Sequence, residues 1–233
     1  MRVTERVAVE ADAREDSPVG RDPAFAAQQQ RDRYGGSVGE INRWIDGLRD
    51  ADGRGWMPHI APIHAGTNAK ALSVLSDPGP ATKDCVGSGF LCIENDDQTA
   101  ETQAHAFAEV GLAAADVLPW NAYPWYSGGT PLKAADKNAG ADVLRRLIGM
   151  LPDLHVVLLQ GGNAKDCWQR VEKADPGLVR RRGLTVLETY HPSRQALWHS
   201  DEAERMRRQQ HRVDTYRQVS DALARLHTTT EGD

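Results

Sequence analysis

The stretch LHVVLLQ, residues 154–160, constrains the fold of this chain more than any other feature. Its valines and leucines are consecutive rather than alternating with polar residues, which is typical of a strand covered on both faces. Three more segments are predicted to be strands, at 71–76, 115–121 and 184–190, and helical patterns lie between or after them at about 97–110, 137–150 and 201–226. This alternation predicts an α/β fold, a three-layer α/β/α sandwich around a central, mostly parallel four-stranded sheet.

The chain is expected to form one domain between two flexible ends. Residues 1–36 are polar, carry alternating charges and lack apolar periodicity, so they are interpreted as a flexible N-terminal arm. The folded domain is expected over 37–228, where Ser37 and Glu40 match a capping box ahead of an amphipathic helix. Residues 229–233 are expected to be a disordered tail.

Composition excludes several classes of protein. The net charge is −5, which argues against coating nucleic acid through charge alone. There is no apolar run of membrane-spanning length, and the N-terminus lacks a secretory h-region. The three cysteines form no C-x-x-C pair. We therefore expect a cytoplasmic monomer with no membrane partner, no metal site and no cofactor.

Unusual polar residues follow each of the four predicted strands. The first strand ends in Asp77-Pro78-Gly79, the second in Asn121, the third in residues 161–163 and the fourth in residues 191–193. The carboxyl ends of parallel strands lie at one edge of a sheet, where ligands bind in α/β proteins. We therefore expect a carboxylate, an amide, a helix N-terminus and an imidazole to share one cleft.

These groups suit cleavage of the bond between a sugar and a flat base. Asp77 can direct a water molecule or stabilise a cationic sugar, and His191 can stabilise a negatively charged leaving group. Asn121 can read the edge of a heterocycle with its amide donors and acceptor. The faces of the base are predicted to stack on aromatic rings, namely Phe90, Trp120 and Tyr126. Backbone N–H groups after Gly161 can hold a phosphate.

Taken together, the segments resemble the uracil-DNA glycosylase superfamily over about residues 70–225. The matching pieces, in chain order, are LSDPGP (75–80), Phe90, Asn121, GGNA (161–164) and HPS (191–193). The chain departs from the family pattern at Leu75, which replaces a glycine, and at Gly79, which replaces a bulky tyrosine in the narrowest uracil enzymes. Gly79 leaves room beside C5 of a pyrimidine, and three cysteines are too few for the iron–sulfur cluster of one branch.

The resemblance implies a DNA glycosylase that flips out a pyrimidine, uracil or a C5-modified base, and leaves an abasic site in single- or double-stranded DNA. Asp77 and His191 would be catalytic, with Asn121 reading the base. DNA contacts are expected from Gly162, Asn163, Lys165, Ser193, Arg194 and Gln195, and the duplex wedge from Arg194, Gln195 and Leu197. The flipped nucleotide of the DNA is the expected partner.

Three functions remain open at this point: a repair enzyme acting on uracil, an anti-phage enzyme specific for a hypermodified base, and a DNA-binding relative without catalysis. An unrelated α/β hydrolase is a more distant alternative, and the chain lacks its G-x-S-x-G nucleophile motif.

Overall fold

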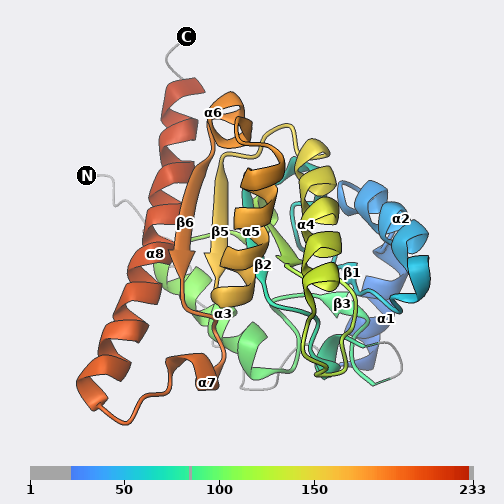
Figure 1. Ribbon diagram of the computed structural model, residues 1–233, viewed down its shortest axis with the longest axis horizontal. Helices are drawn as coiled ribbons and strands as arrows, with labels where there is room; N and C mark the ends of the chain where they lie inside the picture. Colours follow the sequence, from blue (N-terminus) through green and yellow to red (C-terminus); the bar gives the residue numbers. More distant parts are fainter. Residues whose placement is uncertain (1–21, 84–85, 231–233) are drawn as a thin grey trace, which may run out of the picture.

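The computed structural model describes residues 22–83 and 86–230, and its centre is a sheet of four parallel strands (Figure 1). In spatial order the strands are β4 (Val117–Asn121), β2 (Ala71–Leu75), β5 (Val156–Gln160) and β6 (Thr185–Thr189). Helices cover both faces of this sheet, so the predicted α/β/α sandwich is confirmed.

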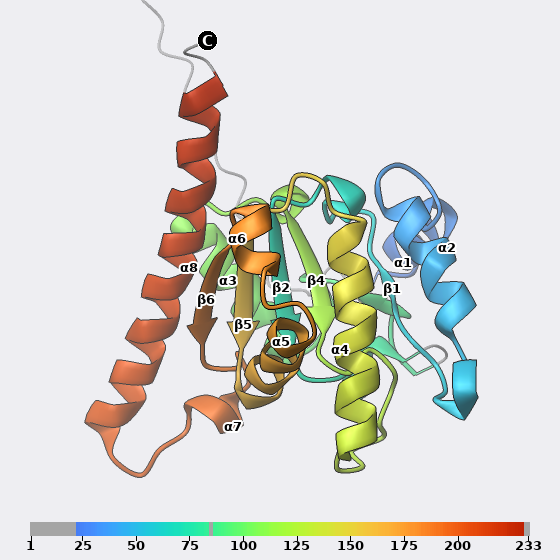
Figure 2. The ribbon, with the colours of Figure 1, turned by 45° about the horizontal axis from the view of Figure 1, so that its top comes forward.

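Two pairs of helices form the outer layers (Figures 1 and 2). On one face lie α4 (Ala134–Gly149) and α5 (Gly162–Ala174), which pack on each other, and α6 (Leu178–Arg182) follows them. On the other face lie α3 (Gln98–Val110) and α8 (Glu202–Thr230). Because side chains alternate along a strand, each strand contributes to two separate apolar clusters, one under each pair of helices.

An N-terminal helical unit lies beside the edge of the sandwich. It contains α1 (Pro23–Asp32), α2 (Val38–Leu48) and a small parallel pair, β1 (His59–Ile60) with β3 (Phe90–Leu91). Short 3₁₀ turns and a short helix complete the fold: η2 (Ala51–Gly53), η3 (Gly66–Asn68), η4 (Pro80–Thr82), η5 (Ala114–Asp116) and α7 (Arg194–Leu197).

Part of the flexible arm predicted over 1–36 forms a helix instead, namely α1 (Pro23–Asp32). The Asp22 side chain accepts the Ala24 N–H at 2.8 Å and caps α1, and Gln29 on that helix is buried. Gln29 reaches the Cys92 sulfur at 3.5 Å, a contact far away in sequence that local patterning does not reveal. Residues 1–21 lie outside the described part of the chain.

The two ends of α3 lie where the sequence predicts them, because residues next to the helix form its caps. Asp97 accepts the N–H groups of Thr99 and Ala100 at 2.9 and 3.0 Å, and Gly111 ends α3 with φ of +66°, as predicted. Ser37 makes no side-chain cap, so the expected capping box is absent. Instead, the Ser37 carbonyl accepts the Thr67 N–H at 3.0 Å.

The C-terminal helix is longer than expected. α8 continues through Thr230, so residues 229 and 230 belong to it rather than to a disordered tail, and residues 231–233 lie outside the described part. In the described ranges no helix combines the length and the apolar character needed to cross a bilayer.

Strand register places the ends of the four strands at one level. Leu75 of β2 pairs with Asn121 of β4, and Gln160 of β5 pairs with Thr189 of β6. The segments that follow all four strands therefore emerge together at the carboxyl edge of the sheet.

Candidate active site

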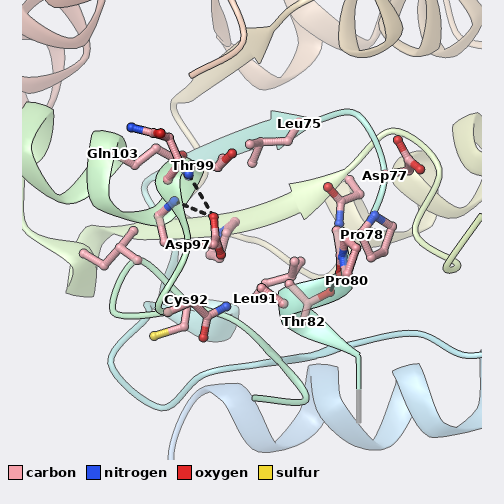
Figure 3. Close-up of a pocket in the computed structure, with 18 of the residues that line it drawn as sticks. Leu75, Asp77, Pro78, Pro80, Thr82, Leu91, Cys92, Asp97, Thr99 and Gln103 are labelled. Atoms are coloured by element: carbon pink, nitrogen blue, oxygen red, sulfur yellow. Dashed lines mark hydrogen bonds between the residues drawn. The ribbon is translucent and has the colours of Figure 1, made fainter. Parts of the chain in front are cut away.

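A pocket of about 320 Å³ opens at this edge, on the α3 side of the sheet (Figure 3). Asp77 after β2, Asn121 at the end of β4 and His191 after β6 all line it. The structure therefore brings together the three residues that the sequence analysis assigned to a common cleft. Sites for small molecules span about 300–1,000 Å³, so a pocket of this size suits a small planar group.

The pocket walls are mostly aliphatic. The strands β2, β3 and β4 contribute Leu75, Leu91 and Pro119, and the segments before η4 and after β3 contribute Pro78 and Ile93. Among the described residues that line the pocket, the imidazole of His191 is the sole aromatic ring. A flat ligand would therefore lie against proline and branched aliphatic surfaces rather than between stacked rings.

The three aromatic residues expected to stack on a base are not pocket residues. Phe90 is fully buried in a small cluster with Ala61 and Cys92. Trp120 stacks on Trp44 at a centroid distance of 5.9 Å, in the core on the opposite side of the sheet.

Strand alternation explains the position of Trp120. Neighbouring residues of a strand point to opposite faces, so Asn121 faces the pocket and Trp120 must face the core. Tyr126 lies outside the pocket and has the ammonium group of Lys83 over its ring at 4.9 Å.

Asn121 is a buried amide whose donor lacks a protein partner. Its side chain is 3% exposed, and Nδ2 makes no hydrogen bond to any described residue. An unsatisfied buried donor costs about 1–3 kcal/mol, and folded proteins rarely contain one without a reason. A ligand acceptor in the pocket that Asn121 lines would remove this cost.

His191 is held as a neutral imidazole with a defined tautomer. The Ser193 N–H donates to its Nδ1 at 3.2 Å, so the ring proton lies on Nε2. Burial lowers the pKa of His191 below its ordinary value, although the Asp77 carboxylate acts in the opposite direction. The pocket therefore contains a neutral N–H donor rather than an imidazolium.

Asp77 is half-buried and its carboxylate is held from two sides. The Ser76 hydroxyl donates to Oδ1 at 2.7 Å, and the Ser127 hydroxyl, from the loop after β4, donates to Oδ2. Asn163 at the start of α5 donates to the Ser76 hydroxyl at 2.8 Å. Neither serine was identified from the sequence, because their contacts with Asp77 depend on where two loops meet.

A second hollow, of about 350 Å³, adjoins the pocket and shares Asp77 and His191 with it. Gly161, Gly162 and Asn163 line this hollow at the N-terminus of α5. Backbone N–H groups at such a position attract anions. Lys165, expected to contact DNA, forms an ion pair with Glu188 at 2.8 Å.

The segment after His191 differs from the predicted wedge. Ser193 caps α7 through the Ala196 N–H at 3.4 Å, and Arg194 and Gln195 are exposed. Leu197 is buried, so it is not available to enter a duplex. Instead Trp198 presents 67% of its surface to solvent. In the sequence, the polar residues HSDE directly after Trp198 are the signal that indicates its exposure.

The free cysteines of the described chain are inert thiols. Cys92 and Cys167 are buried, and burial raises the pKa of each to about 12. Cys85 lies outside the described residues. Within residues 22–83 and 86–230, no group of three or more His, Cys, Asp or Glu side chains is arranged to hold a metal ion.

No protein-family model and no curated protein sequence matches this chain. The functional argument therefore depends on the geometry of the pocket.

Gly161 provides a test of how the backbone positions His191. Its φ is +93°, and a Cβ at this position would lie 3.1 Å from the His191 Cβ. We expect Gly161→Ala to lower the free energy of unfolding by about 1–2 kcal/mol and to shift the NMR resonances of the His191 ring. Gly162→Ala is the matched control, because a Cβ there meets no atom within 4 Å. Equal effects of the two variants on the His191 resonances would contradict this assignment.

Proposed function

We propose that this chain is a DNA glycosylase of the uracil-DNA glycosylase type, which flips a pyrimidine nucleotide out of DNA and hydrolyses its N-glycosidic bond. The observation that carries the proposal is the buried Nδ2 of Asn121, which has no hydrogen-bond partner among the described residues, in the wall of a base-sized pocket that Asp77 and His191 also line. An amide offers donors and an acceptor side by side, which complements the O4 and N3–H edge of uracil.

The two hollows suit the two parts of a nucleotide. The aliphatic pocket fits the base, and the adjoining hollow at the N-terminus of α5 fits the sugar and its phosphate. Asp77 and His191 line both hollows, so they lie where the glycosidic bond would run. Extruding a nucleotide costs a few kcal/mol, and contacts within the pocket offset this cost.

The reaction that this geometry supports is hydrolysis through a cation-like sugar. As the bond between C1′ and N1 lengthens, its electron pair moves onto the base and positive charge develops on the sugar. The Asp77 carboxylate stabilises that charge and directs a water molecule to C1′. The water molecule loses a proton as the new C–O bond forms. The neutral Nε2–H of His191 donates a hydrogen bond to the anionic base, which then takes up a proton on release.

Gly79 favours pyrimidines that carry a C5 substituent as substrates beside uracil. It lines the pocket between Pro78 and Pro80, and a Cβ added there meets no atom within 4 Å. Gly79 places no side chain in this part of the wall, so the proposed substrate range includes both plain and C5-modified pyrimidines. The latter would include the altered bases of phage DNA.

The direct test is excision from a panel of oligonucleotides that carry uracil, 5-hydroxymethyluracil or glucosylated 5-hydroxymethylcytosine, with abasic sites revealed by alkali. We expect the wild type to produce abasic sites on at least one of them. Asp77→Asn and His191→Gln should each lower the single-turnover rate about 10²- to 10³-fold. Asp142→Asn and His105→Gln, on exposed surfaces outside the pocket, serve as matched controls.

Two outcomes would contradict the proposal: a wild type that excises no base from the panel, or a near-normal rate in either pocket variant. DNA binding without any abasic product would favour a non-catalytic relative.

Trp198 is placed to support base flipping from a duplex. It follows the α7 segment that begins at Ser193, and its ring is exposed to solvent. Stacking of an aromatic ring on a base is worth about 1–3 kcal/mol. We therefore expect Trp198→Ala to slow excision from a duplex about tenfold and to leave excision from single strands nearly unchanged. Trp198→Phe keeps a ring and should retain most duplex activity. An equal loss on both substrates in the alanine variant would exclude this role.

A further inference from the structure

A chain of buried hydrogen bonds connects α8 to the pocket. The Tyr216 hydroxyl on α8 donates to Oε1 of Gln160 at 2.6 Å. Gln160, at the end of β5, donates from Nε2 to the Ser73 hydroxyl at 2.7 Å and to Oε1 of Gln103 at 3.1 Å. Tyr216 and Gln160 are fully buried, and Gln103 on α3 is 7% exposed.

This chain has a direction because each glutamine turns its amide oxygen and its amide nitrogen toward different sides. The Tyr216 hydroxyl gives its proton to Gln160 Oε1, so the amide nitrogen of Gln160 must point the other way and supply both remaining bonds. Gln103 consequently accepts through Oε1. Its Nε2 group makes no hydrogen bond to any described residue, which leaves two donor hydrogens at the end of the chain.

Gln103 lines the base pocket, one helical turn after Thr99. Figure 3 shows Gln103 and Thr99 on one side of the pocket and Asp77 on the other. Asp77 lies where the sugar would be, so Gln103 lies beside the part of a bound base that is farthest from the glycosidic bond.

We propose that Gln103 is a specificity-determining residue of this pocket, which Tyr216 holds, through Gln160, with its amide donors directed to the bound base. The inference rests on the proposed function and extends it. A ligand with an oxygen acceptor on its far edge, as in uracil and its C5 derivatives, receives a hydrogen bond there. Cytosine brings an amino group to the same place, and two donors then face each other without an acceptor.

The role of Tyr216 follows from the symmetry of a carboxamide. Without the tyrosine hydroxyl, no hydrogen bond holds Oε1 of Gln160 toward α8. Both glutamine amides can then turn over. Gln103 would then present an acceptor to the pocket as readily as a donor. A purely structural role for Tyr216 predicts lower stability but no change in which base is preferred.

The experiment compares wild type, Gln103→Met, Tyr216→Phe and the double variant, with Gln218→Met on the exposed face of α8 as the matched control. Two quantities are measured: kcat/KM for excision of uracil from single-stranded oligonucleotides, and the affinities of free uracil and free cytosine by NMR titration. Thermal unfolding of each variant shows whether it is folded at the assay temperature.

We expect Gln103→Met to lower kcat/KM for uracil about tenfold and to reduce the preference for uracil over cytosine by a similar factor. Tyr216→Phe should move both quantities in the same direction, and the double variant should be no worse than Gln103→Met alone. The Gln218→Met control should behave as wild type.

The proposal is overturned if Gln103→Met keeps the wild-type preference for uracil, or if the effects of the two substitutions on kcat/KM multiply in the double variant. Should Tyr216→Phe be unfolded, the Gln103→Met result alone decides. Excision by the wild type with an unchanged preference in Gln103→Met would refute this inference and leave the glycosylase function intact. A wild type that neither excises a base nor binds free uracil would refute both.

Discussion

The parallel register of the four central strands is the constraint on which the rest of the molecule depends. Leu75 pairs with Asn121 and Gln160 with Thr189, so all four strands end at the same level and their following segments share one edge. The same register fixes which side chains face the pocket. A slip of one residue in β4 would exchange Asn121 with Trp120, which would place an indole in the pocket and an amide in the apolar core.

The pocket and the adjoining hollow meet at residues with unusual local environments. Asn121 has a buried amide donor without a hydrogen-bond partner among the described residues, burial lowers the pKa of His191, and Gly161 adopts a backbone conformation that disfavours a side chain. All three residues lie at the carboxyl edge of the sheet, and the unsatisfied Asn121 donor is unfavourable for folding by itself. In the function we propose, a bound nucleotide would supply an acceptor for the Asn121 amide and a negative charge for the His191 N–H group to stabilise.

The sequence predicted the features that depend on local periodicity and missed those that depend on distant contacts. The apolar runs revealed the strands, and a local cap at Asp97 revealed the start of α3. The helix α1 was missed because contacts such as that of Gln29 with Cys92 hold it in place. Phe90 was assigned to base stacking because it is aromatic and follows a glycine-containing loop, but its direction is set by β3, which pairs with a segment 31 residues away, His59 opposite Phe90. Placing Gln103 required the position of α3 on the sheet, which the pattern of residues does not give.

The proposed function depends above all on Asn121 reading a pyrimidine seated between Asp77 and His191. The most direct measurement is a crystal structure of the Asp77→Asn variant with a single-stranded oligonucleotide that contains uracil. We expect a flipped uracil in the pocket, with Nδ2 of Asn121 about 2.9 Å from the exocyclic oxygen of the ring. A bound oligonucleotide whose base lies outside the pocket, or a base in the pocket with the Asn121 amide turned away from it, would rule out base recognition by Asn121.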